Sequence, residues 1–158
     1  MSAAAGGTRP GLAIALAVVG FGALGICGLG VIALVTGDEV LAVPALGPVP
    51  GAVGFAASVV AVAAVLWGSV RRPHPSYGSA ALSAIVAPLT YGAGVVTGGV
   101  LGGVDPARLV AAVSAFTLSW FSLALLVSAG IAGWVAVALV RTRAQPPRWR
   151  WEDDDDDE

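Results

Sequence analysis

The chain has 158 residues, of which 57% are hydrophobic and 11% are charged, and its formal net charge is −2. A soluble domain carries about 25% charged residues, so this composition excludes an ordinary soluble protein and indicates an integral membrane protein. The net charge hides an asymmetry, because the last seven residues, 152–158, are all acidic while the rest of the chain is basic. The single cysteine, Cys27, excludes an internal disulfide.

The first apolar segment, 12–35, contains 24 uncharged residues and follows a short leader, 1–11, that we expect to be disordered. The hydrophobic part of a signal peptide is about 7–15 residues long, so this longer segment predicts a retained first span. We interpret Cys27 as a packing residue, since Ile26 is not the small residue that precedes a lipidated cysteine. Small residues form one face of this span: Gly20, Ala23, Cys27 and Gly30.

An apolar loop with three prolines, 36–50, separates the first span from the second, 51–70. We expect this loop to fold back on the helix ends. Trp67 lies near the end of the second span, where tryptophan anchors helices at the membrane interface. His74 follows in a basic turn, and we interpret it as a solvated loop residue because no second ligand-type residue lies near it.

The third span, 79–104, is uncharged and rich in glycine, and the rest of the chain is organised around it. Gly94, Gly98 and Gly102 form two overlapping GxxxG units. Four residues extend the same face toward the start of the span, and we call the whole set the glycine face: Ala80, Ala84, Ala87 and Tyr91. Glycine at this spacing allows a neighbouring helix backbone to approach closely. Pro88 removes one helical hydrogen bond and predicts a kink, either a hinge or a static bend, with Tyr91 one turn later.

Asp105 and Pro106 suit the first positions of a last helix, whose uncharged part, 109–140, holds 32 residues. A helix of that length measures about 48 Å, which exceeds the roughly 30 Å membrane core, so it either tilts or stands partly outside. An aromatic cluster that includes Trp120 predicts the boundary, with 105–115 projecting or lying flat under the loop 40–50. Its small-residue face is the predicted partner of the glycine face: Ala115, Ser119, Ser122, Ala129, Gly133 and Ala136.

The tail, 141–158, combines arginines with Trp149 and Trp151 and then turns acidic. We interpret it as a disordered cytoplasmic segment with an interface anchor; the alternative is a docking peptide for a basic partner. Seven of the eight arginines fall on one side of a four-span arrangement, and Arg108 alone falls on the other. Since positive residues stay cytoplasmic, the sequence predicts an all-α, antiparallel four-helix bundle in the cytoplasmic membrane with both termini inside.

The four predicted spans contain no acidic or basic residue and no histidine. Proton-coupled transport, metal binding, cofactor binding and catalysis all need such groups, so we expect no enzyme, no cofactor and no metal site. Nucleic-acid binding has no support, because the acidic end offsets the tail arginines. We predict a structural or accessory protein that packs in lipid with itself or with a membrane complex. The alternative is a small oligomeric channel lined by weakly polar residues: Thr90, Tyr91, Thr97, Ser119 and Ser122.

Two segments, the loop sequence TGDEVLAVPALGP at 36–48 and the ending PRWRWE at 147–152, resemble an uncharacterised family of small four-span membrane proteins from actinobacteria. The resemblance extends over most of the chain and implies the same four-span fold. It implies no activity, since neither segment carries a known chemistry.

Overall fold

The structure, a computed structural model, describes residues 10–41, 47–70 and 77–144. All but one of the helices in the described part are long and apolar enough to cross a membrane, the exception being α4. The predicted all-helical fold with four membrane-spanning helices is therefore confirmed, with one short helix added before the last span. The helices are α1 (Pro10–Thr36), α2 (Val49–Val70), α3 (Gly78–Leu101), α4 (Pro106–Thr117) and α5 (Trp120–Ala144).

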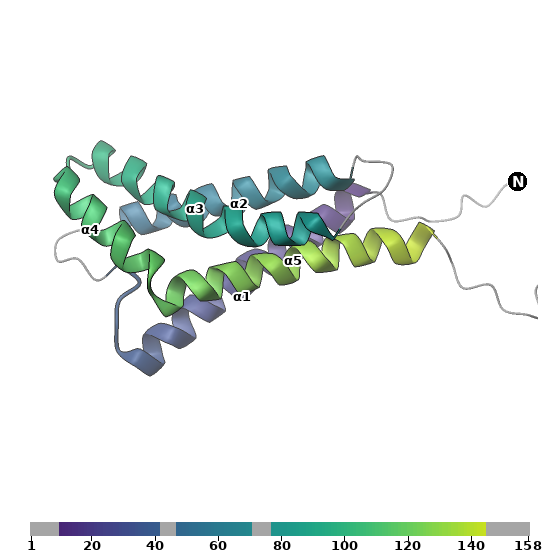
Figure 1. Ribbon diagram of the computed structural model, residues 1–158, viewed down its shortest axis with the longest axis horizontal. Helices are drawn as coiled ribbons and strands as arrows, with labels where there is room; N and C mark the ends of the chain where they lie inside the picture. Colours follow the sequence, from purple (N-terminus) through teal and green to yellow (C-terminus); the bar gives the residue numbers. More distant parts are fainter. Residues whose placement is uncertain (1–9, 42–46, 71–76, 145–158) are drawn as a thin grey trace, which may run out of the picture.

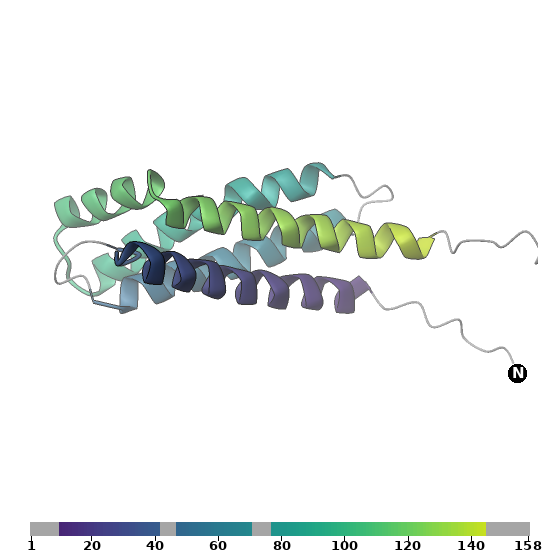
Figure 2. The same cartoon turned by 90° about the horizontal axis from the view of Figure 1, so that it is seen from below.

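The long helices lie in two layers (Figures 1 and 2). One layer holds α1 and α5 side by side, and the other holds α2 and α3, with α3 also in contact with α5. Consecutive long helices run in alternating directions, so the start of α1 and the end of α5 lie at the same end of the molecule (Figure 1). We call this the terminal end, and we call the opposite end, where α3 turns into α4, the loop end.

Aromatic and small residues fill the space between α1 and its neighbours. Phe21 of α1 is fully buried and stacks on Phe55 of α2, with 6.1 Å between the ring centroids. Gly25, one turn further along α1, leaves room for the same Phe55 ring and for Leu125 of α5. Lipid is as apolar as these side chains, so this contact stabilises the bundle mainly through van der Waals packing.

The segment 109–140, predicted as one helix, is divided between α4 and α5. After Thr117 the hydroxyl of Ser119 donates to the carbonyl of Phe116 at 2.6 Å, and the backbone N–H of Ser119 reaches the same carbonyl. The prediction of a continuous helix is wrong because these bonds replace the regular helical ladder, and neither proline nor glycine marks the position. The break falls at the aromatic cluster, and the last candidate span begins at Trp120. The membrane boundary at this position stays a prediction.

The turn between α3 and α4 is closed by backbone hydrogen bonds and a side-chain cap. Gly103 has a φ of 71°, a left-handed conformation that glycine adopts without strain, and two backbone hydrogen bonds close the last turn of α3. The carboxylate of Asp105 accepts from two N–H groups in the first turn of α4. The prediction that Asp105 caps this helix, with Pro106 at its first position, is confirmed.

The short helix α4 folds back along the last turns of α3. Small residues on α3 accommodate the side chains of α4. Whether 105–115 projects from the membrane or lies flat on it stays a prediction. Val40 and Leu41 are partly buried against the core, while the rest of the predicted cover, 42–46, lies outside the described residues. Three side chains of α4 each cover a residue of α3: Leu109 over Gly99, Val113 over Gly92 and Phe116 over Tyr91.

Candidate functional site

The glycine face of α3 contacts α2. A Cβ atom added at Gly94 would lie 2.7 Å from the Cα atom of Gly54, and one added at Gly98 would lie 3.0 Å from the Cβ atom of Val53. A larger residue at Gly94 would therefore have to push two helix backbones apart. The small-residue face of the last helix, which we predicted as the partner of the glycine face, contacts the first part of that face, where Gly133 lies against Ala80. At Gly94 and Gly98 the partner is α2 instead.

The other two predicted packing glycines have different surroundings. Gly102 is exposed just past the end of α3, and a Cβ atom there would meet only carbonyl oxygens of the same helix. Gly133 of α5 lies against the first turn of α3, where an added Cβ atom would be 2.7 Å from the Cα atom of Ala80. Near the start of α3, the helix backbone therefore makes a close contact with α5. Near the end of α3, it makes a close contact with α2.

A buried serine lies at or near each of these two contacts. Ser58 of α2 is fully buried, and its hydroxyl donates to the carbonyl of Ala87 on α3 at 2.9 Å. Ser83 of α3 is also fully buried, beside Gly133, but its hydroxyl has no hydrogen-bond partner within the described residues. Ser58 thus joins two helices through a polar bond, whereas Ser83 contributes packing volume alone.

Tyr91 lies where α2, α3 and α4 meet. Its side chain is 2% exposed and stacks on the ring of Phe116, with 4.4 Å between the ring centroids. Its hydroxyl lies beside Gly51 in the first turn of α2. Pro88, one turn earlier, leaves α3 unbroken, and a bend at this proline stays a prediction. Tyr91 is therefore a packing residue beneath α4.

The weakly polar residues suggested as a channel lining do not face a common cavity. The hydroxyls of Thr90 and Thr97 donate to carbonyls of their own helix at 2.8 Å and 2.9 Å. Tyr91 is covered by α4, so it faces no open space. Ser119 and Ser122 do line one hollow together. These bonds hold the two threonine hydroxyls against their own helix. The alternative of a channel between several copies of the chain stays a prediction.

The outer side of α1 carries small residues that no described helix covers. Gly20 is partly exposed, and Ala23, Cys27 and Gly30 are exposed. A Cβ atom added at Gly20 or Gly30 would meet nothing within 4 Å. We call these four residues the α1 small face. The inner side of α1 uses other residues, among them Gly25, to pack on its neighbours.

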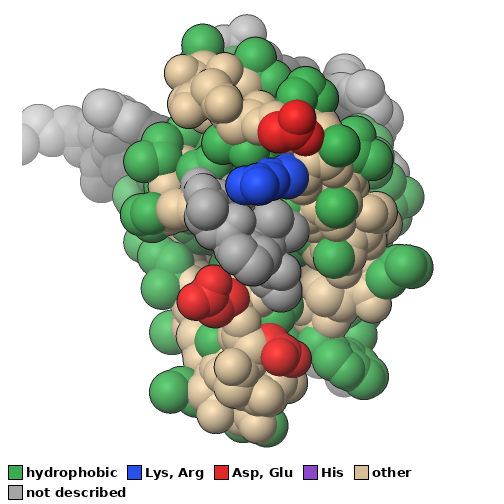
Figure 3. All heavy atoms as spheres, turned by 90° about the vertical axis from the view of Figure 1, so that its left-hand side faces the viewer, with side chains coloured by type: hydrophobic (Ala, Val, Ile, Leu, Met, Phe, Trp, Pro, Cys, Tyr) green, Lys and Arg blue, Asp and Glu red, His purple; other side chains and the backbone are tan. Residues whose placement is uncertain are grey.

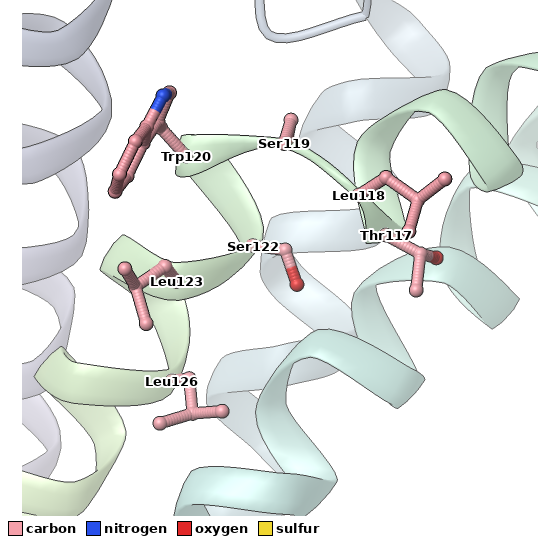
Figure 4. A pocket seen from close by; sticks show the side chains of 7 residues that line it. All are labelled: Thr117, Leu118, Ser119, Trp120, Ser122, Leu123 and Leu126. Atoms are coloured by element: carbon pink, nitrogen blue, oxygen red, sulfur yellow. The ribbon is translucent and has the colours of Figure 1, made fainter.

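Three hollows meet where α4 joins α5. The junction hollow, of about 350 Å³, is lined by residues 117–120, 122, 123 and 126 (Figure 4). The α1 hollow, of about 330 Å³, lies between Trp120 and residues 31, 32, 35 and 36 of α1. The acidic hollow, of about 200 Å³, includes Asp38 and Glu39 and shares Ser119 with the junction hollow. Trp120 contributes to both larger hollows.

The charged side chains that the structure describes lie at the loop end (Figure 3). Three acidic side chains and one arginine side chain are exposed at this end, away from the contacts between the long helices. The residues are Asp38, Glu39, Asp105 and Arg108.

Residues 9–158 match the family of unknown function DUF6121. The chain belongs to this family. No curated protein and no solved structure matches it. This family is consistent with the resemblance to an uncharacterised family noted in the sequence. It assigns no activity, ligand or partner to this member of DUF6121. The actinobacterial origin stays a prediction.

The predicted tryptophan anchors of this DUF6121 member lie at different positions. Trp67 lies near the terminal end and is 48% exposed, whereas Trp120 lies at the junction of α4 and α5 and is 68% exposed. The other two predicted anchors, Trp149 and Trp151, lie outside the described residues. Trp134 is also exposed, at mid-length on α5, and the sequence analysis missed it because no charge or turn nearby marks an interface.

Proposed function

We propose that this protein is an accessory component of the cytoplasmic membrane that binds a second membrane helix through the α1 small face. The observation that supports this is the difference in glycine coverage. Gly94 on α3 is covered by α2, whereas Gly20 and Gly30 on α1 face open space. Small residues on a lipid-facing surface allow another backbone to approach closely and gain van der Waals contact.

A role without catalysis has support from the placement of the charges. General acid–base catalysis works best when the ionisable groups converge where water is excluded. The described ionisable groups at the loop end are instead exposed. A channel has no comparable support, because the hydroxyls of Thr90 and Thr97 are bonded within their own helix.

The binding proposal is tested by photo-crosslinking in native membranes. A photoreactive amino acid at Ala23, on the α1 small face, is expected to give a covalent product of higher mass. Ala56 is the matched control, because it is an exposed alanine near the middle of α2. A doubled mass would identify a second copy, and another mass would identify a different protein. Absence of a product from Ala23, or equal products from both positions, would contradict the proposal.

We further propose that the terminal end is cytoplasmic. Its support is the arginine distribution, seven against one, and the position of the start of α1 and the end of α5 on the same side of the bundle (Figure 1). Green fluorescent protein fused to either end is expected to fluoresce, and alkaline phosphatase fused to either end is expected to be inactive. Active phosphatase at one end would overturn this orientation.

A further inference from the structure

Trp120 lines two hollows, the junction hollow (Figure 4) and the α1 hollow. In the junction hollow, Leu123 and Leu126 follow Trp120 along α5, away from the loop end. In the α1 hollow, Val35 and then Val31 lie progressively further from the loop end, because α1 runs toward that end. Both hollows therefore extend from Trp120 toward the terminal end, as an acyl chain extends from the membrane surface.

The walls of the two hollows are large apolar side chains that the described protein leaves uncovered. Leu118 is 91% exposed, Val35 is 80% exposed and Trp120 is 68% exposed. Trp120 is also the first residue of the last candidate span, and tryptophan is enriched at the boundary of the hydrocarbon core. An empty hollow would forfeit dispersion contacts along these walls, and acyl chains are the molecules at hand to fill it.

Polar groups stand at the mouth of the hollows. The acidic hollow adjoins the junction hollow at Ser119 and brings Asp38 and Glu39 to this position. Both acids are exposed, and neither forms an ion pair with another described residue. The hydroxyl of Ser122 lies on the wall of the junction hollow (Figure 4). Two carboxylates at a membrane surface attract a cationic group and repel an anionic one.

We propose that this surface binds one zwitterionic phospholipid with two acyl chains. The two acyl chains of the lipid lie on opposite sides of the Trp120 side chain, one in the junction hollow and the other in the α1 hollow. Its ammonium group lies near Asp38 and Glu39, so the site selects against anionic phospholipids. The α1 hollow is formed by residues outside the α1 small face, so lipid binding is independent of the proposed helix partner.

Native mass spectrometry of the full-length protein in mild detergent tests the site, with phosphatidylethanolamine and phosphatidylglycerol of the same chain length as probes. One phosphatidylethanolamine is expected to remain bound per chain, with about tenfold higher affinity than phosphatidylglycerol. Trp120→Ala is expected to weaken retention of both lipids about tenfold. Trp134→Ala is the matched control, because it removes another exposed tryptophan of α5 that lines neither hollow.

The double variant Asp38→Asn/Glu39→Gln tests the headgroup contact separately, and it is expected to retain both lipids equally. Circular dichroism checks that each variant keeps its helical content, which is expected because the replaced side chains are exposed. Equal retention by the two tryptophan variants would overturn the site. Wild-type protein that holds phosphatidylglycerol as tightly as phosphatidylethanolamine would overturn the headgroup assignment.

Discussion

α1 and α3 are built from the same residue types but have opposite surroundings. Gly94 of α3 faces the backbone of Gly54, whereas Gly30 of α1 has nothing within 4 Å of an added Cβ atom. The spacing of small residues is similar in both helices, so spacing indicates only that a close contact is possible. Whether the contact forms within the chain depends on a second small residue at the matching height of a neighbouring helix.

The largest expected effect is on the covered glycine. Gly94→Val should lower the free energy of unfolding by about 3 kcal/mol, because the new side chain collides with the α2 backbone. Gly30→Val is the control and should change it by less than about 0.5 kcal/mol. Thermal or denaturant unfolding of the purified protein in detergent measures both. Similar losses for the two variants would remove the distinction between α1 and α3.

A smaller effect is expected where α4 covers α3. Phe116→Ala should lower the free energy of unfolding by about 2 kcal/mol, because the ring stacked on Tyr91 is lost and detergent or lipid fills part of the space. Leu118→Ala, one of the most exposed apolar positions, should have almost no effect on stability in the same unfolding measurement. If Phe116→Ala behaves like Leu118→Ala, α4 is not held on α3.

The smallest effects separate the two buried serines. Ser58→Ala should reduce stability by about 1 kcal/mol, because it removes a hydrogen bond between α2 and α3. Ser83→Ala should be neutral or slightly stabilising, since its hydroxyl has no partner to lose within the described residues. Unfolding of both variants under identical conditions provides the comparison, and a larger loss for Ser83→Ala would contradict it.

Much of the architecture can be predicted from the sequence because apolar length and charge placement are strong signals. The four long apolar helices and the Asp105 cap follow from helix rise and capping preference. The partner of Gly94 and Gly98 does not follow. The last span carries small residues at helical spacing, whereas Gly54, which lies against Gly94, belongs to no face that the sequence pattern marked.

The break between α4 and α5 was also beyond the sequence. Ser119 ends α4 with hydrogen bonds that serine makes equally well inside a helix, as the threonines of α3 do here. The three hollows around Trp120 depend on this break, because the junction hollow forms where α4 leaves the axis of α5. The lipid site could therefore be recognised only once the two helices were placed in space.

The contact between Gly54 and Gly94 has a directional consequence. In glycine, a second hydrogen takes the place of the Cβ atom. From Gly54 this direction leads to the carbonyl oxygen of Tyr91, 2.8 Å from the Cβ position, and from Gly94 it leads to the carbonyl oxygen of Val53, at 3.0 Å. A carbonyl of the other helix thus occupies the side-chain position of each glycine, so neither position accommodates a side chain. Sliding one helix by a single residue would bring a residue with a Cβ atom against these carbonyls, so this pair of glycines sets the register between α2 and α3.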